Sequence, residues 1–234
     1  MAAGLEILNG NNRILIDSKY RNHFLKKKIT VTTSVVISLW TGSSAQVVIP
    51  DAVCPIVLWR SSAGFGYYSL IWSGSTATAT LHTPSAAGTS VTIYVFDAMP
   101  PTPSNYGLQV YNEQGELVYD ALSKPLRITQ YKRGEAIIST PMEPLNIPLG
   151  SEEYAYGNSS FVGSMIGIIT PLAPPNFRYQ MVHNFRYYQQ QSGMLVQRQF
   201  TPYQFDRTMT DGTVSQYENT TFDYQVIVAD VTNY

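Results

Sequence analysis

The chain has 234 residues, of which 13 % are charged, and its formal net charge is −1. Ordinary soluble domains carry about 25 % charged residues, and a net charge near zero gives no electrostatic basis for binding nucleic acid or an anionic membrane. Tyrosine is frequent, with 17 copies. A neutral, polar surface of this kind suits permanent packing against neighbouring proteins.

One pattern occurs twice along the chain. Residues 4–9 (GLEILN) and 14–17 (ILID) recur as residues 107–112 (GLQVYN) and 117–120 (LVYD) with the same internal spacing. A short turn rich in Asn or Gly separates the two hydrophobic runs in each copy, and these residue types tolerate a positive φ. Each copy therefore predicts a β-hairpin, and we interpret the repeat as a duplication of whole domains.

The repeat sets the expected domain boundaries. Residues 93–97 (IYVFD) and 226–230 (VIVAD) resemble each other and would close the two units. The Pro-rich segment 100–105 suits neither a helix nor a sheet. We therefore expect two tandem domains of the β-sandwich or jelly-roll type, at residues 1–99 and 106–234, joined by this linker. The second domain is longer and carries a mid-domain insertion.

Alternation with a period of two residues predicts strands in both units, and helical periodicity is almost absent. In the first unit the predicted strands, after the hairpin, are 29–40, 46–49, 55–60, 66–72, 76–81 and 90–97. In the second they are 107–111, 116–119, 126–131, 135–139, 161–170, 176–188, 194–200, 213–217 and 221–231. Short strands at regular spacing predict an all-β sandwich. Residues 150–160 and 188–193 are expected to be loops that order against a partner.

Two local features have structural interpretations. Residues 26–28 are three consecutive lysines, which we interpret as a solvated strand edge protected against unwanted pairing. Cys54 is the single cysteine, so no internal disulfide forms, and its apolar neighbours predict a buried, inert thiol.

The candidate interaction surface lies between residues 176 and 207. The tetrapeptide NFRY at 176–179 recurs at 184–187, and an even spacing in a strand returns the same residue types to the same face. Aromatic residues should then lie on one face and arginines on the other. The candidate residues are Phe177, Arg178, Tyr179, Phe185, Arg186, Tyr187, Arg198 and Arg207.

Three interpretations of this surface stay open. The aromatic side chains could fill the core while the Arg and Gln side chains are solvated, or the surface could be a wet subunit interface. It could also bind glycans, with Trp40, Trp59 or Trp72 contributing.

No motif of an enzyme or a metal centre is found. The three histidines are not paired at ligand spacing, and a single cysteine cannot complete a zinc site. Residues 64–66 (GFG) lack the third glycine and the following helix of a dinucleotide fingerprint, and no nucleophile elbow or P-loop occurs. We therefore expect a non-enzymatic protein with no catalytic residues, no metal and no cofactor.

The second hairpin carries a family resemblance. The pattern G-L-x-V-x-N-x-x-G-x-L-V-Y-D at 107–120, followed by PLRI at 125–128 and preceded by IYVFD and the Pro-rich connector, resembles small β-sheet structural proteins of tailed bacteriophages. These are encoded among the tail-tip and tail-fibre genes of siphophages and prophages. The resemblance covers about residues 90–130 and, more loosely, 4–20, where Asn12 replaces the hairpin glycine found at Gly115.

The resemblance implies a virion protein of the minor tail, the tail tip or a fibre. Such a protein would pack against copies of itself and neighbouring tail proteins. The alternatives are a capsid decoration protein and a host-surface carbohydrate-binding module. The start of the chain has no signal-peptide pattern and no apolar run is long enough to span a bilayer, so we expect synthesis in the host cytoplasm, assembly into the virion and no membrane insertion.

Overall fold

The structure is a computed structural model that describes residues 6–8, 14–17, 22–35, 41–98, 103–135, 146–158, 163–172, 176–209, 217–220 and 223–234. Every regular element in these ranges is a β-strand, so the predicted all-β class is confirmed. All strand pairs within the sheets are antiparallel. Within these ranges, no helix has the length and hydrophobicity that a membrane crossing requires.

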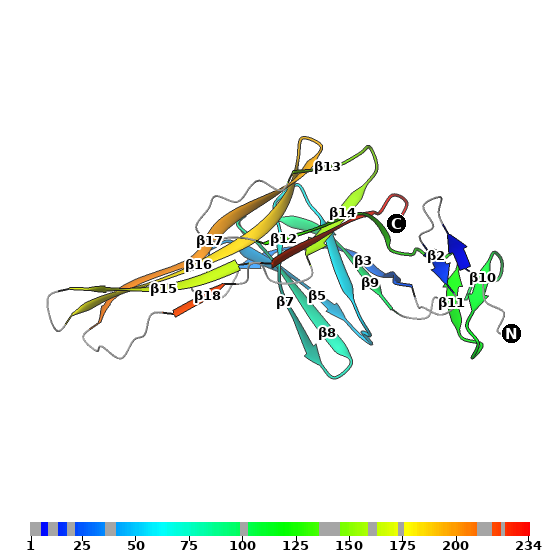
Figure 1. The fold of residues 1–234 in the computed structure, drawn as a ribbon, viewed down its shortest axis with the longest axis horizontal. Coiled ribbons are helices and arrows are strands. Elements are labelled where there is room, and N and C mark those ends of the chain that lie inside the picture. Colours follow the sequence, from blue (N-terminus) through cyan, green and yellow to red (C-terminus); the bar gives the residue numbers. More distant parts are fainter. Residues whose placement is uncertain are drawn as a thin grey trace.

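A six-stranded sheet forms the centre of the molecule (Figure 1). Its order is β12 (Arg127–Glu135), β19 (Asp223–Asp230), β14 (Tyr154–Asn158), β6 (Ile56–Arg60), β9 (Ser90–Asp97) and β3 (Phe24–Thr32). Strands from both predicted units lie in this one sheet, and they meet where Tyr156 of β14 pairs with Trp59 of β6. The expected division into two separate sandwich domains joined by a linker is therefore not supported.

A four-stranded sheet packs against one face of the six-stranded sheet and completes a β-sandwich. Its order is β4 (Ser34–Val35), β5 (Ser43–Ile49), β8 (Thr76–Thr83) and β7 (Gly66–Ser73). Alternate residues of β5 and β8 point into the core, as period-two patterning requires. The core buries Trp59, Ile93 and Tyr156 from the six-stranded sheet against Leu81 from the other. Each such side chain stabilises the fold by about 1.5–3 kcal/mol.

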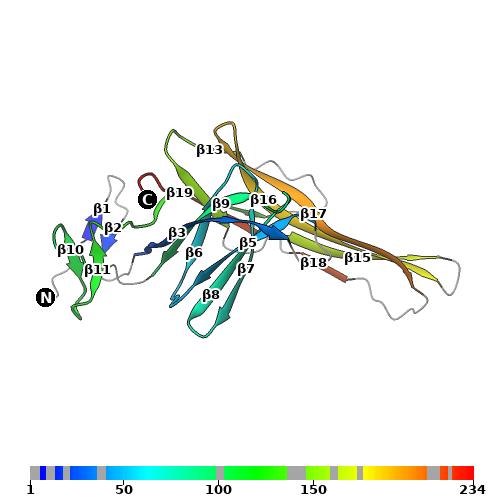
Figure 2. The same cartoon turned by 180° about the vertical axis from the view of Figure 1, so that it is seen from behind.

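A third sheet runs out of the sandwich as a long projection (Figures 1 and 2). Its order is β13 (Asn146–Pro148), β17 (Met194–Met209), β16 (Phe177–Gln191), β15 (Gly163–Pro171) and β18 (Tyr217–Thr220). With 15 residues, β16 is about 50 Å long at 3.3 Å per residue. We call β15, β18, residues 177–183 of β16 and residues 203–209 of β17 the arm.

The two predicted hairpins form and lie at the end of the molecule opposite the arm (Figures 1 and 2). They consist of β1 (Glu6–Leu8) with β2 (Ile14–Asp17), and β10 (Gln109–Tyr111) with β11 (Leu117–Asp120). Their registers match, since Glu6 pairs with Asp17 as Gln109 pairs with Asp120. Both shift register at the same place, after the second residue of the first strand. The sequence repeat is therefore a repeat of this hairpin, irregularity included.

Aspartate ends three of the strands in the same way. The backbone N–H of Ala98 donates to Asp97, that of Leu122 to Asp120 and that of Thr232 to Asp230, at 2.8–2.9 Å. A short carboxylate that accepts a backbone N–H one or two residues further on stabilises a turn and stops the ladder. This explains why the endings of residues 93–97 and 226–230 resemble each other.

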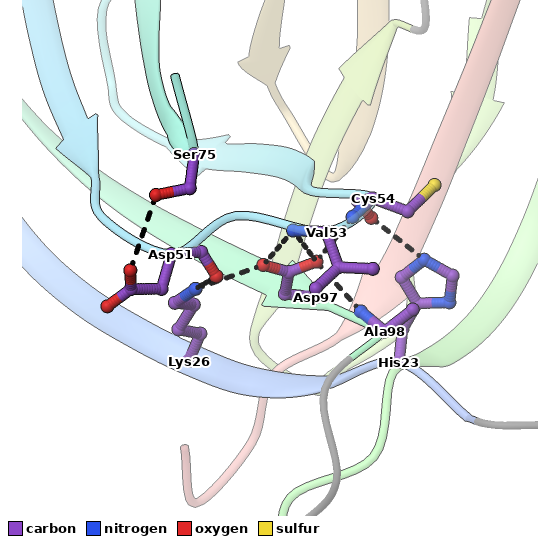
Figure 3. A network of polar contacts seen from close by, with 8 residues as sticks. All are labelled: His23, Lys26, Asp51, Val53, Cys54, Ser75, Asp97 and Ala98. Carbon is purple, nitrogen blue, oxygen red and sulfur yellow. Dashed lines mark hydrogen bonds and ion pairs between the residues drawn. The ribbon is translucent and has the colours of Figure 1, made fainter. Parts of the chain in front are cut away.

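The carboxylate of Asp97 is fully buried and anchors the loop between β5 and β6 (Figure 3). It accepts hydrogen bonds from the backbone N–H groups of Val53 and Cys54, and Lys26 Nζ lies 3.1 Å from it. Burial by itself raises the pKa of this carboxyl, but these donors outweigh burial and hold the pKa below its usual value. The ionised form is thus built into the fold.

Cys54 differs from the expectation of a buried thiol, because its side chain is exposed. Its main chain is what the fold uses: the N–H bonds Asp97, and His23 Nε2 donates to its carbonyl oxygen at 3.0 Å (Figure 3). The apolar neighbours of Cys54 in the sequence therefore gave a wrong prediction of its burial.

Most predicted strands are present, with some corrections. Residues 126–131 and 135–139 were expected as two strands, and β12 is one strand through Glu135. The strand predicted to end at 200 continues to Met209. Residues 150–160, expected as a loop, contain the buried strand β14, and β16 extends through 188–191. The prediction that residues 26–28 lie on a sheet edge is confirmed, because β3 is an edge strand. Segments 36–40, 136–139, 161–162, 213–216 and 221–222 lie outside the described residues.

We predict that Asp120→Asn lowers the free energy of unfolding by about 1–3 kcal/mol. Asp120 is fully buried and accepts hydrogen bonds from Ser104 N and Oγ, Gln109 Nε2 and Leu122 N. An amide directs N–H groups at one set of these donors. Urea unfolding at neutral pH measures the change, with exposed Glu113→Gln in the same hairpin as control. Equal stability of both variants and the parent would contradict the role assigned to Asp120.

Candidate functional site

The arm joins the sandwich at residues 64–66, and this joint organises the candidate surface. The N–H of Phe65 donates to the carbonyl of Tyr188 at 3.0 Å, and the N–H of Tyr188 donates to the carbonyl of Phe65 at 2.8 Å. Both side chains are fully buried. These two hydrogen bonds connect the residue just before β7, in the sandwich, to β16 of the third sheet.

The glycines on either side of Phe65 allow this approach. A Cβ on Gly66 would lie 2.2 Å from the carbonyl oxygen of Arg186, and one on Gly64 would lie 2.1 Å from the Tyr187 ring. Neither distance is compatible with a side chain. The GFG pattern, which is not a dinucleotide fingerprint, therefore has a packing role, as glycines in strands often do where another backbone comes close.

Three of the predicted surface residues belong to the joint. Phe185 is fully buried, and its ring lies edge-to-face on His82 with centroids 5.7 Å apart. Tyr187 is half-buried beside Gly64. Arg186 is half-buried as well, and burial lowers the pKa of its guanidinium. Sequence reasoning found these residues but not their neighbours, because Gly64 and His82 are far away along the chain.

The remaining predicted residues do not join them in one patch. Arg178 is exposed and Tyr179 half-buried near the far end of the arm. Arg198 is exposed and donates to Gln191 Oε1 at 2.8 Å. The side chains of Phe177 and Arg207 lie outside the described residues, so the alternation predicted for the aromatic residues of β16 stays a prediction. The eight residues thus divide between the joint, the arm and the turn after β16.

A bulge separates the joint from the arm. Between the pairs His183–Tyr203 and Phe185–Phe200, β17 has one residue more than β16. Pro202, which has no N–H to donate, lies in this interval, as is usual for proline in a sheet. Such an irregularity bends the ribbon where it leaves the sandwich.

Of the tryptophans considered for a glycan surface, Trp59 and Trp72 lie in different sheets, on β6 and β7. Trp59 is fully buried in the core, and Trp72 is 46 % exposed at the end of β7. Trp40 lies outside the described residues. Because Trp59 has no exposed surface, Trp59 and Trp72 do not form a common aromatic platform for a glycan.

A polar groove lies beside the joint and was not expected from the sequence. It has a volume of about 470 Å³ and is lined by Arg60, Ser61, Ser62, Ser90, Thr92 and Gln190. The lining comes from the end of β6, the start of β9 and the end of β16. No sequence motif links these positions, because only the sheet topology brings them together.

In the described ranges, no group of three or more His, Cys, Asp or Glu side chains is placed to hold a metal ion. Of the adjacent carboxylates at 152 and 153, Glu153 pairs with Arg60 at 2.8 Å and Glu152 accepts from the Tyr154 hydroxyl at 2.6 Å. These two carboxylates therefore make separate structural contacts.

No protein-family model matches this chain, and no curated protein or solved structure matches it. The function is therefore inferred from the geometry of the molecule and from its hairpin pattern.

We predict that Gly66→Ala destabilises the fold by about 1–3 kcal/mol, because the new methyl group overlaps a main-chain oxygen that cannot move alone. Gly64→Ala overlaps only the Tyr187 ring. In a Tyr187→Ala background the cost of Gly64→Ala should therefore fall, while that of Gly66→Ala should persist. Thermal unfolding of the five variants measures both differences. A Gly66→Ala protein as stable as its parent would contradict the close approach.

We also predict that His82 makes the joint sensitive to acid. His82 is buried, and desolvation lowers the pKa of its imidazole, although a hydrogen bond with the Thr41 carbonyl opposes this. A folded pKa below the unfolded value of about 6.5 means that the full stability is present above that value and falls as the pH drops below it. The Tm should therefore decrease between pH 7.5 and pH 5.5. The Tm of His82→Gln should decrease less across the same interval. An equal decrease of Tm in His82→Gln and in the parent would rule out this role of His82.

Proposed function

We propose that this chain is a non-enzymatic structural component of a bacteriophage virion, in the minor tail, the tail tip or a fibre. It acts by packing its β-sheets against other copies of itself and neighbouring tail proteins. The observation that carries the proposal is the arm, and the resemblance of the second hairpin to phage tail proteins gives the setting.

The arm is a single layer. Among the described residues, no second sheet lies against it in either view (Figures 1 and 2). A sheet needs another layer of structure to bury an apolar face. The base of the sheet meets this need inside the chain, because Ile147, Tyr188 and Leu195 are buried in the sandwich core.

The sequence of β15 indicates that the arm is covered in use. Its nine residues, GSMIGIITP, include Met165, Ile166, Ile168 and Ile169. A nearly continuous apolar run is typical of strands that are covered on both faces. A neighbouring subunit in an assembly would supply that cover, which agrees with the low charge of the whole chain.

Cryo-electron microscopy of the virion tests the setting. A sandwich with a protruding arm at the tail, the tail tip or a fibre supports the proposal. The same density on the head would instead make the chain a capsid decoration protein. Absence of the chain from purified particles would sink both versions.

We predict that Leu172→Glu weakens self-association of the purified protein about tenfold or more, because a charge would be placed in an apolar contact. Leu172 is 42 % exposed and follows β15 at the far end of the arm. Val48→Glu, at a 52 % exposed site on β5 of the sandwich, is the matched control and should associate like the parent. Sedimentation velocity measures both. A parent protein that stays monomeric, or equal effects of the two substitutions, contradicts packing through the arm.

A further inference from the structure

The groove beside the joint has the composition of a binding site for a hydroxyl-rich ligand. All six lining residues are polar, and four of them carry hydroxyl groups. Its volume of about 470 Å³ lies in the range of small-molecule sites, which is about 300–1,000 Å³. Most such sites are lined by apolar side chains. This lining instead disfavours an apolar ligand.

Hydrogen bonds hold the wall of the groove in place. Ser61 Oγ donates to the Ser90 carbonyl at 2.8 Å and accepts from the N–H of Ala63 at 3.2 Å. From the end of β16, Gln189 Nε2 donates to the Ser62 carbonyl at 3.1 Å. The turn after β6 is therefore fixed to both β9 and β16, so a ligand would meet a preorganised surface.

Arg60 is the one cation among the described lining residues, and its charge is already compensated. Arg60 pairs with Glu153 Oε1 at 2.8 Å, and this hydrogen bond, with a smaller contribution from Tyr94, raises the pKa of the guanidinium despite partial burial. The two side chains are 41 % and 48 % exposed, so each keeps hydrogen-bonding capacity toward solvent. A neutral ion pair gives no net charge to attract an anion.

Three polar groups of the lining have no hydrogen-bond partner among the described residues. They are the hydroxyls of Ser62 and Ser90 and the side-chain amide of Gln190. Together they supply donors and acceptors in one neutral wall. Sugar hydroxyls both donate and accept, so this mixture matches them better than it matches a carboxylate or a phosphate.

We propose that this groove binds a short neutral oligosaccharide. The inference does not depend on the virion role, and it concerns a site distinct from the aromatic residues of 176–207. Because no aromatic ring is found among the described lining residues, binding rests on hydrogen bonds that compete with water, and each copy binds weakly. Several copies in one assembly would raise the effective affinity.

The test is an NMR titration of the ¹⁵N-labelled full chain with a panel of neutral disaccharides: maltose, cellobiose, lactose and chitobiose. Sodium sulfate serves as the anion probe. We expect saturable shifts of the Ser62 and Ser90 backbone amides and of the Gln190 side-chain amide with at least one sugar, and none with sulfate. No saturable shift with any sugar, shifts centred elsewhere, or sulfate binding alone would overturn the proposal.

Variants locate the site. Gln190→Ala and Ser62→Ala should each weaken sugar binding about 3–10-fold, which corresponds to the loss of one or two neutral hydrogen bonds. Gln114→Ala, at an exposed glutamine in the turn of the second hairpin, should bind like the parent. Circular dichroism confirms that all three fold. Unchanged affinity of both groove variants would place any sugar binding outside the groove.

Discussion

The close approach of two main chains at the joint is the constraint on which the rest of the molecule depends. Phe65 and Tyr188 can exchange two backbone hydrogen bonds because glycine occupies positions 64 and 66. The bridge fixes where β16 leaves the sandwich and hence where the arm points. It also sets the distance between the turn after β6 and the end of β16, which form the groove. A methyl group at position 66 would thus disturb the exit of β16 from the sandwich, the direction of the arm and the shape of the groove.

The joint also makes the arm and the sandwich one cooperative unit. Tyr188 and Leu195 at the base of the third sheet are buried in the same cluster as Trp59 and Tyr156 of the six-stranded sheet. Phe185 and Tyr188 lie three positions apart, on opposite faces of β16, yet both are fully buried. Both faces of β16 are therefore covered at its base. Further out, along the arm, no second described layer covers either face. The direction of the arm is therefore set by contacts within the chain, and the packing proposed above would need little reorientation of the arm.

Local features of the fold could be predicted from the sequence, and non-local ones could not. The hairpins could be predicted because a turn of four residues separates the two hydrophobic runs of each copy. The strands could be predicted from the alternation of apolar and polar residues within each segment. The shared sheet depends on a pairing of Tyr156 with Trp59 that leaves no local trace. The two copies of the sequence repeat, which begin at residues 4 and 107, correspond to two hairpins. The interpretation of the repeat as a duplication of whole domains was not supported. In β14, Gly157 resembled a loop residue, whereas its Cβ position is filled by the Val57 carbonyl. The groove was missed for the same reason as the shared sheet, since its lining comes from three distant segments.

The two proposals place their partners on different parts of the molecule. β16 runs from the far end of the arm through Phe185 and Tyr188 to Gln190, so the joint separates the arm from the groove. A neighbour that covers the single-layered arm would lie on residues 177–183 of β16 and leave Gln190 on the sandwich side of the joint. The hairpins lie at the opposite end again (Figures 1 and 2). Subunit packing along the arm and sugar binding in the groove are therefore sterically compatible, and loss of one does not require loss of the other.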